Sequence, residues 1–311
     1  MRLGLQLRAY VPSAHGNHFD TLLAVARACE QAGLDSVWMA DHFLGGASAD
    51  PATPGDRLPV PEAFVSLGAI AAATTRIRIG ELVVGAPYRN PALLAKMCAT
   101  LDVVSHGRSI VGLGAGWYAP EFVAYGWPFP SVRARLAMLE EAVQVVDRLL
   151  TQRPATFRGT YYTVEHAYNE PPPVQRPRPP LLIGGSGERV TLRLVARYAD
   201  MCNVDGDPAT VARRFAVLRR HCAAVGRPFE AITRSNSASV LLARDAAAVA
   251  AKRARFPAFR GLSGTPGEVI AGLKGYADAG SQYVTLHVPD AVDIEPLLLL
   301  GETVVPAVAR L

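Results

Sequence analysis

The sequence has few cysteines and lacks a long apolar run. Its four cysteines, Cys29, Cys98, Cys202 and Cys222, are widely separated and form no C-x-x-C pair, which argues against a disulfide framework and a zinc site. We expect buried thiols in a reducing cytosol. No apolar run is long enough to cross a bilayer, and a strand predicted from Arg2 onward leaves no signal peptide ahead of it. The sequence therefore predicts a soluble, cytoplasmic protein that makes no membrane contact.

Blocks of basic residues are also absent. The net charge of +5 and the isoelectric point near 9.2 come from arginines spread along the chain, without interleaved aromatic residues. Nucleic acid is therefore not the expected partner, and an acidic small molecule fits the charge equally well. His15 and His18 have no acidic neighbour at metal-ligand spacing, so no metal site is predicted.

Short apolar runs recur along the chain and predict strands. They lie at residues 3–7, 35–40, 77–84, 109–114, 181–184, 201–204, 237–242 and 283–288. Several are almost continuously apolar, which is typical of parallel strands covered on both faces, and helical segments follow nearly every one. With 311 residues and 50% hydrophobic content, the chain suits one large barrel or two medium domains. Eight alternating strands and helices favour an α/β fold, a (β/α)8 TIM barrel formed by residues 1–311 as a single domain.

Capping residues support the predicted helices. Asn90, Asp207 and Thr265 each precede a proline, as expected for an N-cap before the first helical position. Glycines follow the predicted helix ends at positions 33, 107, 226 and 280, where a left-handed cap favours glycine.

Two irregular regions interrupt the alternation and predict insertions after the second and fourth strands. The first covers residues 45–61. The second covers about 151–180, with a hairpin expected to pair Thr156–Phe157 with Tyr161–Tyr162 across Gly159, followed by a proline-rich stretch. A stiff linker between two domains is the alternative interpretation of that stretch. We favour an insertion, because the alternation of strands and helices resumes afterwards with the same period.

A glycine-rich turn, Gly184-Gly185-Ser186-Gly187, joins the fifth predicted strand to a helix. Glycines let a ligand approach the backbone, and amides at a helix start favour an anion, so this turn predicts a phosphate site. It matches neither a P-loop, a nucleophile elbow nor a dinucleotide fingerprint, because Glu188 and Val190 stand where those motifs require other residues. A tight turn without a ligand is the alternative.

Polar residues follow the second predicted strand, where a barrel places its chemistry. His42 can exchange a proton near neutral pH, and the neighbouring Asp41 can accept a hydrogen bond from a ligand. The alternative is that Asp41 caps a helix and His42 only packs. His287 and Asn203 end later strands and could also reach the barrel mouth, although neither lies in a motif.

Small residues at positions 112–116 follow the fourth predicted strand and allow a flat ring to lie close to the backbone. Trp117 and Tyr118 are then expected to wall a substrate pocket, with Glu121 as a second polar group. A loop that is merely packed in the core is the alternative, and it suits Tyr118 better than Trp117.

Four segments in this order resemble the bacterial luciferase-like monooxygenase superfamily, and within it the coenzyme F420-dependent oxidoreductases. The segments are Asp41-His42-Phe43, residues 80–91, residues 107–117 and Gly184-Gly185-Ser186-Gly187. The resemblance covers almost the whole chain.

The resemblance implies a barrel that holds a flavin or deazaflavin at the strand ends, in a protein that forms a homodimer. His42 would be the proton donor, and Asp41 would contact the ring. A non-proline cis peptide would fall at Leu82-Val83. The implied cofactor contacts are Asp41, Leu82, Val83, Gly85, Gly114, Ala115, Gly184, Gly185, Ser186, Gly187, Arg189 and Val190.

Two positions depart from the resemblance. Leu82 stands where some relatives carry a serine before the bend that supports the ring. The sugar-phosphate dehydrogenases of this family carry a catalytic glutamate where this chain has Trp117. Glu121 follows four residues later and is the catalytic candidate that could replace it.

The leading hypothesis is therefore an F420-dependent oxidoreductase that moves a hydride to or from a small organic substrate, with His42 transferring the proton. An FMN-dependent monooxygenase on the same barrel is the alternative. A non-redox phosphate-binding enzyme belongs to another class, and the placement of Lys96, Lys252 and Lys274 in predicted helices argues against its Schiff-base form. A binding protein without turnover is a further alternative.

Overall fold

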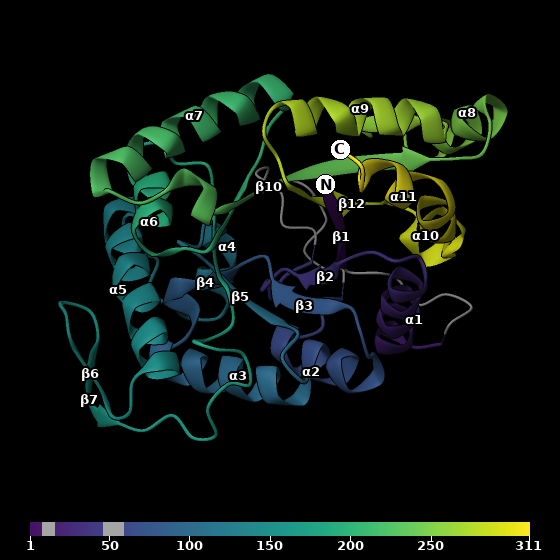
Figure 1. Cartoon of the computed structure of the whole chain (residues 1–311). Coiled ribbons are helices and arrows are strands. Elements are labelled where there is room, and N and C mark those ends of the chain that lie inside the picture. Colours follow the sequence, from purple (N-terminus) through teal and green to yellow (C-terminus); the bar gives the residue numbers. More distant parts are fainter. Residues whose placement is uncertain (8–15, 46–58) are drawn as a thin grey trace.

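The computed structural model describes residues 1–7, 16–45 and 59–311, and eight parallel strands at its centre form a closed barrel (Figure 1). Each strand pairs in parallel with the next, and β12 closes the barrel by pairing with β1, with Tyr283 opposite Arg2. The predicted (β/α)8 barrel is confirmed. In order around the barrel, the strands are β1 (Arg2–Leu7), β2 (Ser36–Met39), β3 (Arg78–Glu81), β5 (Ser109–Gly114), β8 (Leu181–Gly184), β9 (Met201–Val204), β10 (Thr233–Leu242) and β12 (Tyr283–His287).

Helices surround the barrel and alternate with its strands (Figure 1). The expected N-caps are present at Asn90 and Asp207, and Glu268 accepts a hydrogen bond from the Thr265 amide. The helices are α1 (His18–Gln31), α2 (Ala63–Ala73), α3 (Pro91–Val104), α4 (Ala119–Ala124), α5 (Val132–Thr151), α6 (Thr191–Tyr198), α7 (Pro208–Val225), α8 (Ala246–Arg255), α9 (Pro266–Asp278), α10 (Glu295–Leu299) and α11 (Val305–Val308). Within the described part of the chain, none of them has the length and apolar character that a membrane span requires.

A separate cluster of buried side chains fills the inside of the barrel. Its members come from five different strands and are Trp38, Ile110, Leu182, Met201 and Tyr283. Side chains of five barrel strands can contact one another only across the interior. Because this plug fills the barrel, a ligand has room only beyond the strand ends.

The structure corrects several predicted strand boundaries. Strand β10 begins at Thr233, four residues before the predicted start, because Ser235 and Asn236 interrupt the apolar run although both are buried. The predicted strand over residues 77–84 is divided: β3 ends at Glu81, and the short β4 (Val84–Gly85) pairs with β5. A short strand that was not predicted, β11 (Leu262–Gly264), lies beside the end of β10.

The second insertion contains the predicted hairpin, but its predicted pairing was wrong. Strand β6 (Ala155–Arg158) pairs with β7 (Thr163–Ala167), so that Phe157 lies opposite Val164. Residues 159–162 form the turn instead, because the Glu141 carboxylate accepts hydrogen bonds from the amides of residues 160, 161 and 162. Most of the first insertion, residues 46–58, lies outside the described residues, as does His15.

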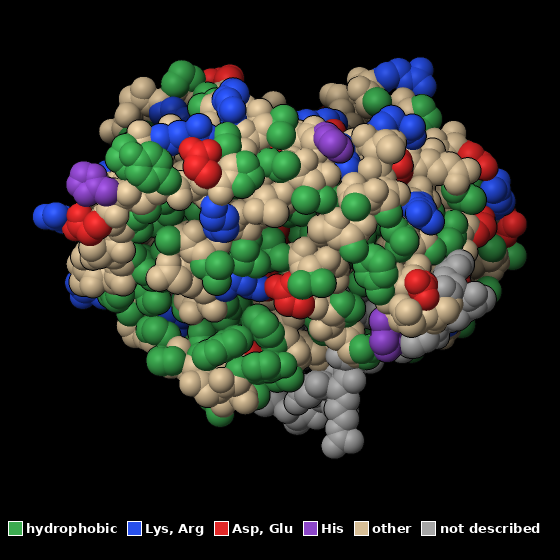
Figure 2. Space-filling model, turned by 90° about the horizontal axis from the view of Figure 1, so that it is seen from below, with side chains coloured by type: hydrophobic (Ala, Val, Ile, Leu, Met, Phe, Trp, Pro, Cys, Tyr) green, Lys and Arg blue, Asp and Glu red, His purple; other side chains and the backbone are tan. Residues whose placement is uncertain are grey.

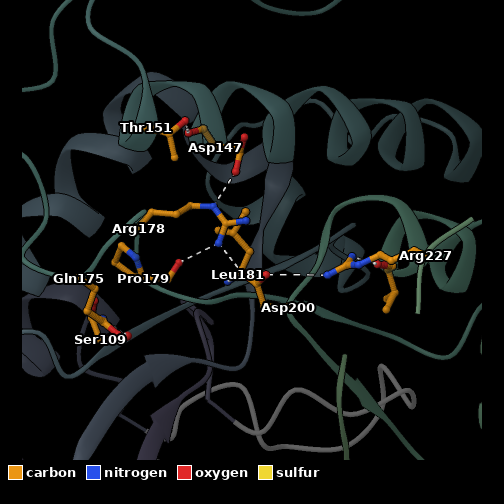
Figure 3. A network of polar contacts seen from close by, with 10 residues as sticks. Ser109, Asp147, Thr151, Gln175, Arg178, Pro179, Leu181, Asp200 and Arg227 are labelled. Atoms are coloured by element: carbon orange, nitrogen blue, oxygen red, sulfur yellow. Dashed lines mark hydrogen bonds and ion pairs between the residues drawn. The ribbon is translucent and has the colours of Figure 1, made fainter. Parts of the chain in front are cut away.

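The proline-rich stretch is attached to the barrel by an arginine that joins two aspartates (Figure 3). Arg178 Nε lies 2.6 Å from Asp147 on α5, and its Nη1 lies 2.5 Å from Asp200, just before β9. Asp200 also accepts a hydrogen bond from the Leu181 amide at 2.9 Å and faces Arg227 at 3.9 Å. These contacts fix the chain as it enters β8 and therefore position the glycine-rich turn that follows.

Candidate active site

A cavity of about 730 Å³ lies at the carboxyl ends of the barrel strands. It is large enough for a ring-shaped ligand and a small second molecule. Ten of the residues predicted to form the site line it: Asp41, His42, Leu82, Val83, Gly85, Gly114, Ala115, Trp117, Gly184 and Gly185. The strand-end placement thus brings together residues from four predicted segments.

His42 is held by a buried carboxylate. Its Nδ1 lies 3.0 Å from both oxygens of Glu121, whose side chain is completely buried. Because this contact occupies Nδ1, Nε2 is the ring nitrogen that His42 presents to the cavity. The edge of the His42 ring also packs at 5.8 Å from Trp117 and 6.1 Å from Tyr118.

Glu121 receives hydrogen bonds from several donors in addition to His42. The amides of Phe43 and Leu44 donate to it at 2.8 and 3.0 Å, and the Tyr88 hydroxyl donates at 2.6 Å. Burial raises the pKa of this carboxyl, but the hydrogen bonds from His42, Tyr88 and Leu44 outweigh it, and the pKa lies below its usual range. Glu121 is not among the residues that line the cavity, so its position suits orienting His42 better than the direct catalytic contact expected from the sequence.

Asp41 is engaged by an arginine. Arg89 binds both of its carboxylate oxygens, and Arg89 Nη2 lies 2.9 Å from Oδ1. The same Nη2 lies 2.6 Å from Glu62, just before α2. Burial raises the pKa of Asp41 above its ordinary value, while Arg89 opposes that rise. Asp41 therefore lines the cavity with its carboxylate paired to Arg89. In the sequence, Arg89 was included only as a member of residues 80–91, and no role was predicted for it.

One side of the cavity, here called its floor, is formed by Leu82, Val83 and the glycines that pack against Val83. The Leu82–Val83 peptide is cis, at the position that the resemblance implies. A Cβ added to Gly114 would lie 2.5 Å from Val83 Cγ2, and one added to Gly184 would lie 2.7 Å from Val83 Cγ1. Only glycine fits at these two positions while Val83 occupies the space between them. The result is a smooth apolar surface suited to a flat ring.

The glycine-rich turn lines the cavity at its start only. Gly184, Gly185 and Thr191 reach the cavity, whereas the other predicted members of the turn, Ser186, Gly187, Arg189 and Val190, do not line it. Ser186 Oγ accepts a hydrogen bond from the Asp205 amide at 3.1 Å. Helix α6 begins at Thr191, four residues beyond Gly187. A phosphate would therefore bind to the backbone of the turn and not directly to the first amides of the helix.

Polar side chains form a further wall of the cavity. Asn203, Asp205, Ser237 and His287 all line it, from the ends of β9 and β12 and the middle of β10. Asn203 accepts a hydrogen bond from Ser237 Oγ at 3.0 Å. The sequence pointed to Asn203 and His287, but it missed Ser237 because the start of β10 was misplaced.

Tyr118 differs from its predicted role. Its side chain is buried, and it is not among the residues that line the cavity. It packs behind His42 instead of walling the substrate space, while its neighbour Trp117 is 53% exposed and does line the cavity. The alternative interpretation from the sequence, a residue packed in the core, therefore holds for Tyr118 and not for Trp117.

A buried glutamate lies near the site without a hydrogen-bond partner. Glu81, the last residue of β3, is 1% exposed, and neither carboxylate oxygen has a partner within the described residues. Burial raises its pKa to about 8, and the nearby charge of Asp41 adds to the rise. Glu81 is therefore predominantly a neutral acid at neutral pH.

The three lysines lie away from the cavity. They are located on α3, α8 and α9, and Lys252 and Lys274 pair with Asp290 and Asp278. This placement gives no support to a Schiff-base enzyme.

Comparison with known proteins shows the family of this chain. The model of the luciferase-like monooxygenase family matches residues 1–282. An F420-dependent glucose-6-phosphate dehydrogenase of Kineococcus radiotolerans is 30% identical over 320 residues, which cover 89% of each chain. The chain therefore belongs to the luciferase-like monooxygenase family.

Two solved structures share the fold. An F420-dependent secondary alcohol dehydrogenase, in complex with an F420-acetone adduct, superposes with a TM-score of 0.82 at 23% identity, over 99% of this chain and 98% of the other. An EDTA monooxygenase from Chelativorans sp. superposes with a TM-score of 0.84 at 18% identity, over 100% of this chain and 94% of the other. At these identities the likeness concerns the fold alone.

Proposed function

We propose that this protein is an F420-dependent oxidoreductase that transfers a hydride between the deazaflavin and a small organic substrate. The observation that carries the proposal is His42, which a buried Glu121 holds at a cavity with a glycine-bordered apolar floor. The 30% identity to an F420-dependent dehydrogenase supports the choice of cofactor.

The residues around the floor fit a flat cofactor. Val83 fills the space beside Gly114 and Gly184, so the ring would meet a smooth surface made by Leu82, Val83, Gly85, Gly114 and Ala115. Its phosphate would be received at Gly184 and Gly185, where the turn lines the cavity. The adjoining Ser186, Gly187, Arg189 and Val190 are the further contacts that the resemblance implies. Bound F420 supplies hydride transfer, which no side chain of the protein can perform.

His42 would handle the proton that accompanies the hydride. The Glu121 carboxylate accepts the hydrogen of Nδ1, so Nε2 is the atom that donates a proton to the substrate or removes one from it. Glu121 stabilises the ring when it carries the extra proton, because a carboxylate lies within hydrogen-bond distance of it. Asp41, held by Arg89, would orient the cofactor ring.

Titration of the purified protein with F420 and with FMN tests this proposal. Cofactor fluorescence should change with F420 at micromolar concentrations and change little with FMN. Binding of FMN without binding of F420 would replace the proposal with an FMN-dependent monooxygenase. Tight F420 binding with no reduction or oxidation of any substrate would indicate a binding protein instead.

We also propose that the whole chain is one domain and that two copies form a homodimer. Hydrophobic side chains gather on the face of the molecule seen from below (Figure 2), along which α2 and α3 lie in Figure 1. Exposed apolar residues on these helices include Val65, Leu93 and Val104. Such a patch favours association with another apolar surface.

Light scattering after size-exclusion chromatography tests the dimer. Wild-type protein should have twice the monomer mass, and Val65→Glu with Leu93→Glu should shift it toward the monomer. Val123→Glu, at an exposed apolar position on α4, is the control and should leave the mass unchanged. A monomeric wild-type protein would contradict the proposed dimer.

A further inference from the structure

We infer that the substrate of this site is an uncharged, largely apolar organic molecule, and that phosphorylated or carboxylated substrates are disfavoured. The inference rests on the proposed function, since it concerns the substrate that shares the cavity with the cofactor. It goes beyond that function because it names the chemical class of the substrate.

Several apolar side chains contribute to the cavity wall, and one of them, Trp117, contacts His42. Leu44, Val60 and Pro61 line the cavity together with Trp117. The ring of Trp117 stands edge-on to His42 at 5.8 Å, with an interplanar angle of 83°. If the reacting group of a substrate lies at His42 Nε2, the rest of the molecule contacts these apolar side chains. Such contacts favour an uncharged molecule.

The described lining of the cavity offers no lysine or arginine to an anionic substrate. Of the residues in the described ranges that line the cavity, Asp41 and Asp205 are acidic and none is a lysine or arginine. A phosphate or carboxylate placed beside Trp117 and His42 would lose water on entering, and no lysine or arginine of the described lining would replace those contacts.

Two described arginines, Arg89 and Arg135, contact residues that line the cavity, and both are held by other groups. Arg89 is bound by Asp41 and Glu62. Arg135 donates to the carbonyl oxygen of Gly116 at 3.1 Å and to that of Pro130, and its guanidinium stacks over Phe129 at 4.0 Å. Recruiting either arginine to a substrate would break existing contacts.

The relative in Kineococcus radiotolerans is a glucose-6-phosphate dehydrogenase at 30% identity. The inferred preference separates this chain from that activity.

Equilibrium binding of two matched ketones tests the inference. Cyclohexanone and 4-oxocyclohexanecarboxylate share the reacting carbonyl and the ring but differ by one negative charge. Isothermal titration calorimetry, with and without bound cofactor, should give a dissociation constant at least about tenfold lower for cyclohexanone. Glucose 6-phosphate should bind no better than the carboxylate. Tighter or equal binding of either anion, or no binding of cyclohexanone at millimolar concentrations, would overturn the inference.

A charge placed in the apolar wall should reverse the preference. Trp117→Arg should weaken the binding of cyclohexanone and strengthen the binding of the carboxylate. The ratio of their dissociation constants should change at least about tenfold. Val123→Arg adds the same charge at a position that is 77% exposed and does not line the cavity, so its ratio should equal that of the wild type. An unchanged ratio in Trp117→Arg would show that the ligand binds elsewhere and would overturn the assignment.

This test does not depend on turnover. If F420 fails to bind while cyclohexanone still binds better than its carboxylate, the proposed cofactor is wrong and the substrate class stands. If F420 binds and the anions bind best, the substrate class is wrong and the proposed function stands.

Discussion

His42 Nδ1 lies 3.0 Å from both carboxylate oxygens of Glu121, although the two residues are 79 positions apart in the sequence. The carboxylate comes from α4 and the imidazole from the loop after β2. Glu121 holds Nδ1 of the His42 ring in place, and Nε2 is the nitrogen proposed to transfer a proton. Several consequences of this arrangement and of its surroundings can be measured.

Replacement of Glu121 by glutamine should lower kcat more than it changes KM. The amide keeps the size of the side chain but removes the negative charge behind His42, so proton transfer should slow by about 10- to 100-fold. KM should change less than about threefold, because Glu121 does not line the cavity. Steady-state kinetics across pH 5–9 would measure both values. A large rise of KM at unchanged kcat would contradict an orienting role.

Replacement of His42 by alanine should remove the proton donor and leave cofactor binding intact. We expect turnover to fall by about 10²- to 10⁴-fold, the usual contribution of a general acid or base. The dissociation constant of F420, followed by fluorescence, should stay within about threefold of the wild-type value, because residues of other loops form the floor. Unchanged turnover in this variant would exclude His42 as the proton donor.

The stability of the protein should fall as the pH rises from about 4.5 to 8, through Glu81. The folded-state pKa of Glu81 is about 8 against an ordinary 4.5, so the folded state retains a proton that the unfolded state has lost. At 1.36 kcal/mol per pKa unit, this shift removes at most about 5 kcal/mol across that window.

Glu81→Gln should therefore be more stable than the wild type at pH 8 and gain little at pH 5. Denaturant melts at both values measure this difference. Glu230→Gln is the control, since Glu230 is exposed, and its effect should be small at either pH. Glu121 acts in the opposite direction, because its pKa is lowered, and its contribution is lost only as the pH falls below about 4.5.

Replacement of Gly114 by alanine should destabilise the protein and weaken cofactor binding, because the new Cβ would lie 2.5 Å from Val83 Cγ2. Overpacking of this kind costs about 1–3 kcal/mol of unfolding free energy. In the double variant Gly114→Ala with Val83→Ala, much of the stability should return, because the clashing methyl groups are gone. Cofactor binding should stay weak, because the apolar floor for the ring is lost.

Gly68→Ala is the matched control for this pair. Gly68 lies within α2, and nothing stands within 4 Å of its Cβ position, so alanine should stabilise the helix by about 0.5–1 kcal/mol. Chemical denaturation measures all three variants. A stable Gly114→Ala protein that binds F420 normally would show that Val83 moves freely and does not define the floor.

The barrel was predictable because its strands are short, apolar and regularly separated by helices. The predicted strand boundaries were wrong where buried residues of a strand are polar. In β10, Ser235 Oγ donates to the Cys202 carbonyl oxygen of β9 at 2.6 Å, and Asn236 Oδ1 accepts from Ser281 Oγ, just before β12, at 2.6 Å. Neighbouring segments satisfy these polar side chains, and the hydrophobic pattern of the sequence does not reveal them. Strand β11 has three residues and is too short to show a pattern.

The site was predictable only as far as strand ends reveal it. His42, Asp41 and the first glycines of the turn follow predicted strands directly, and all of them reach the cavity. Partners could not be paired from one sequence, because Glu121 with His42 and Arg89 with Asp41 depend on how distant loops pack. The resemblance implied that Ser186, Gly187, Arg189 and Val190 contact the cofactor, but they precede helix α6, which begins at Thr191, and do not line the cavity.

Trp117 and Glu121 lie on one short segment, and this placement bears on any redesign of the enzyme. The tryptophan lines the cavity, and the glutamate four residues later holds His42, the proposed acid-base residue. Insertions or deletions between them would enlarge or reduce the substrate space and misalign His42 at the same time. A programme that seeks new substrates should therefore vary side chains at positions 60 and 117 and keep the length of the segment constant.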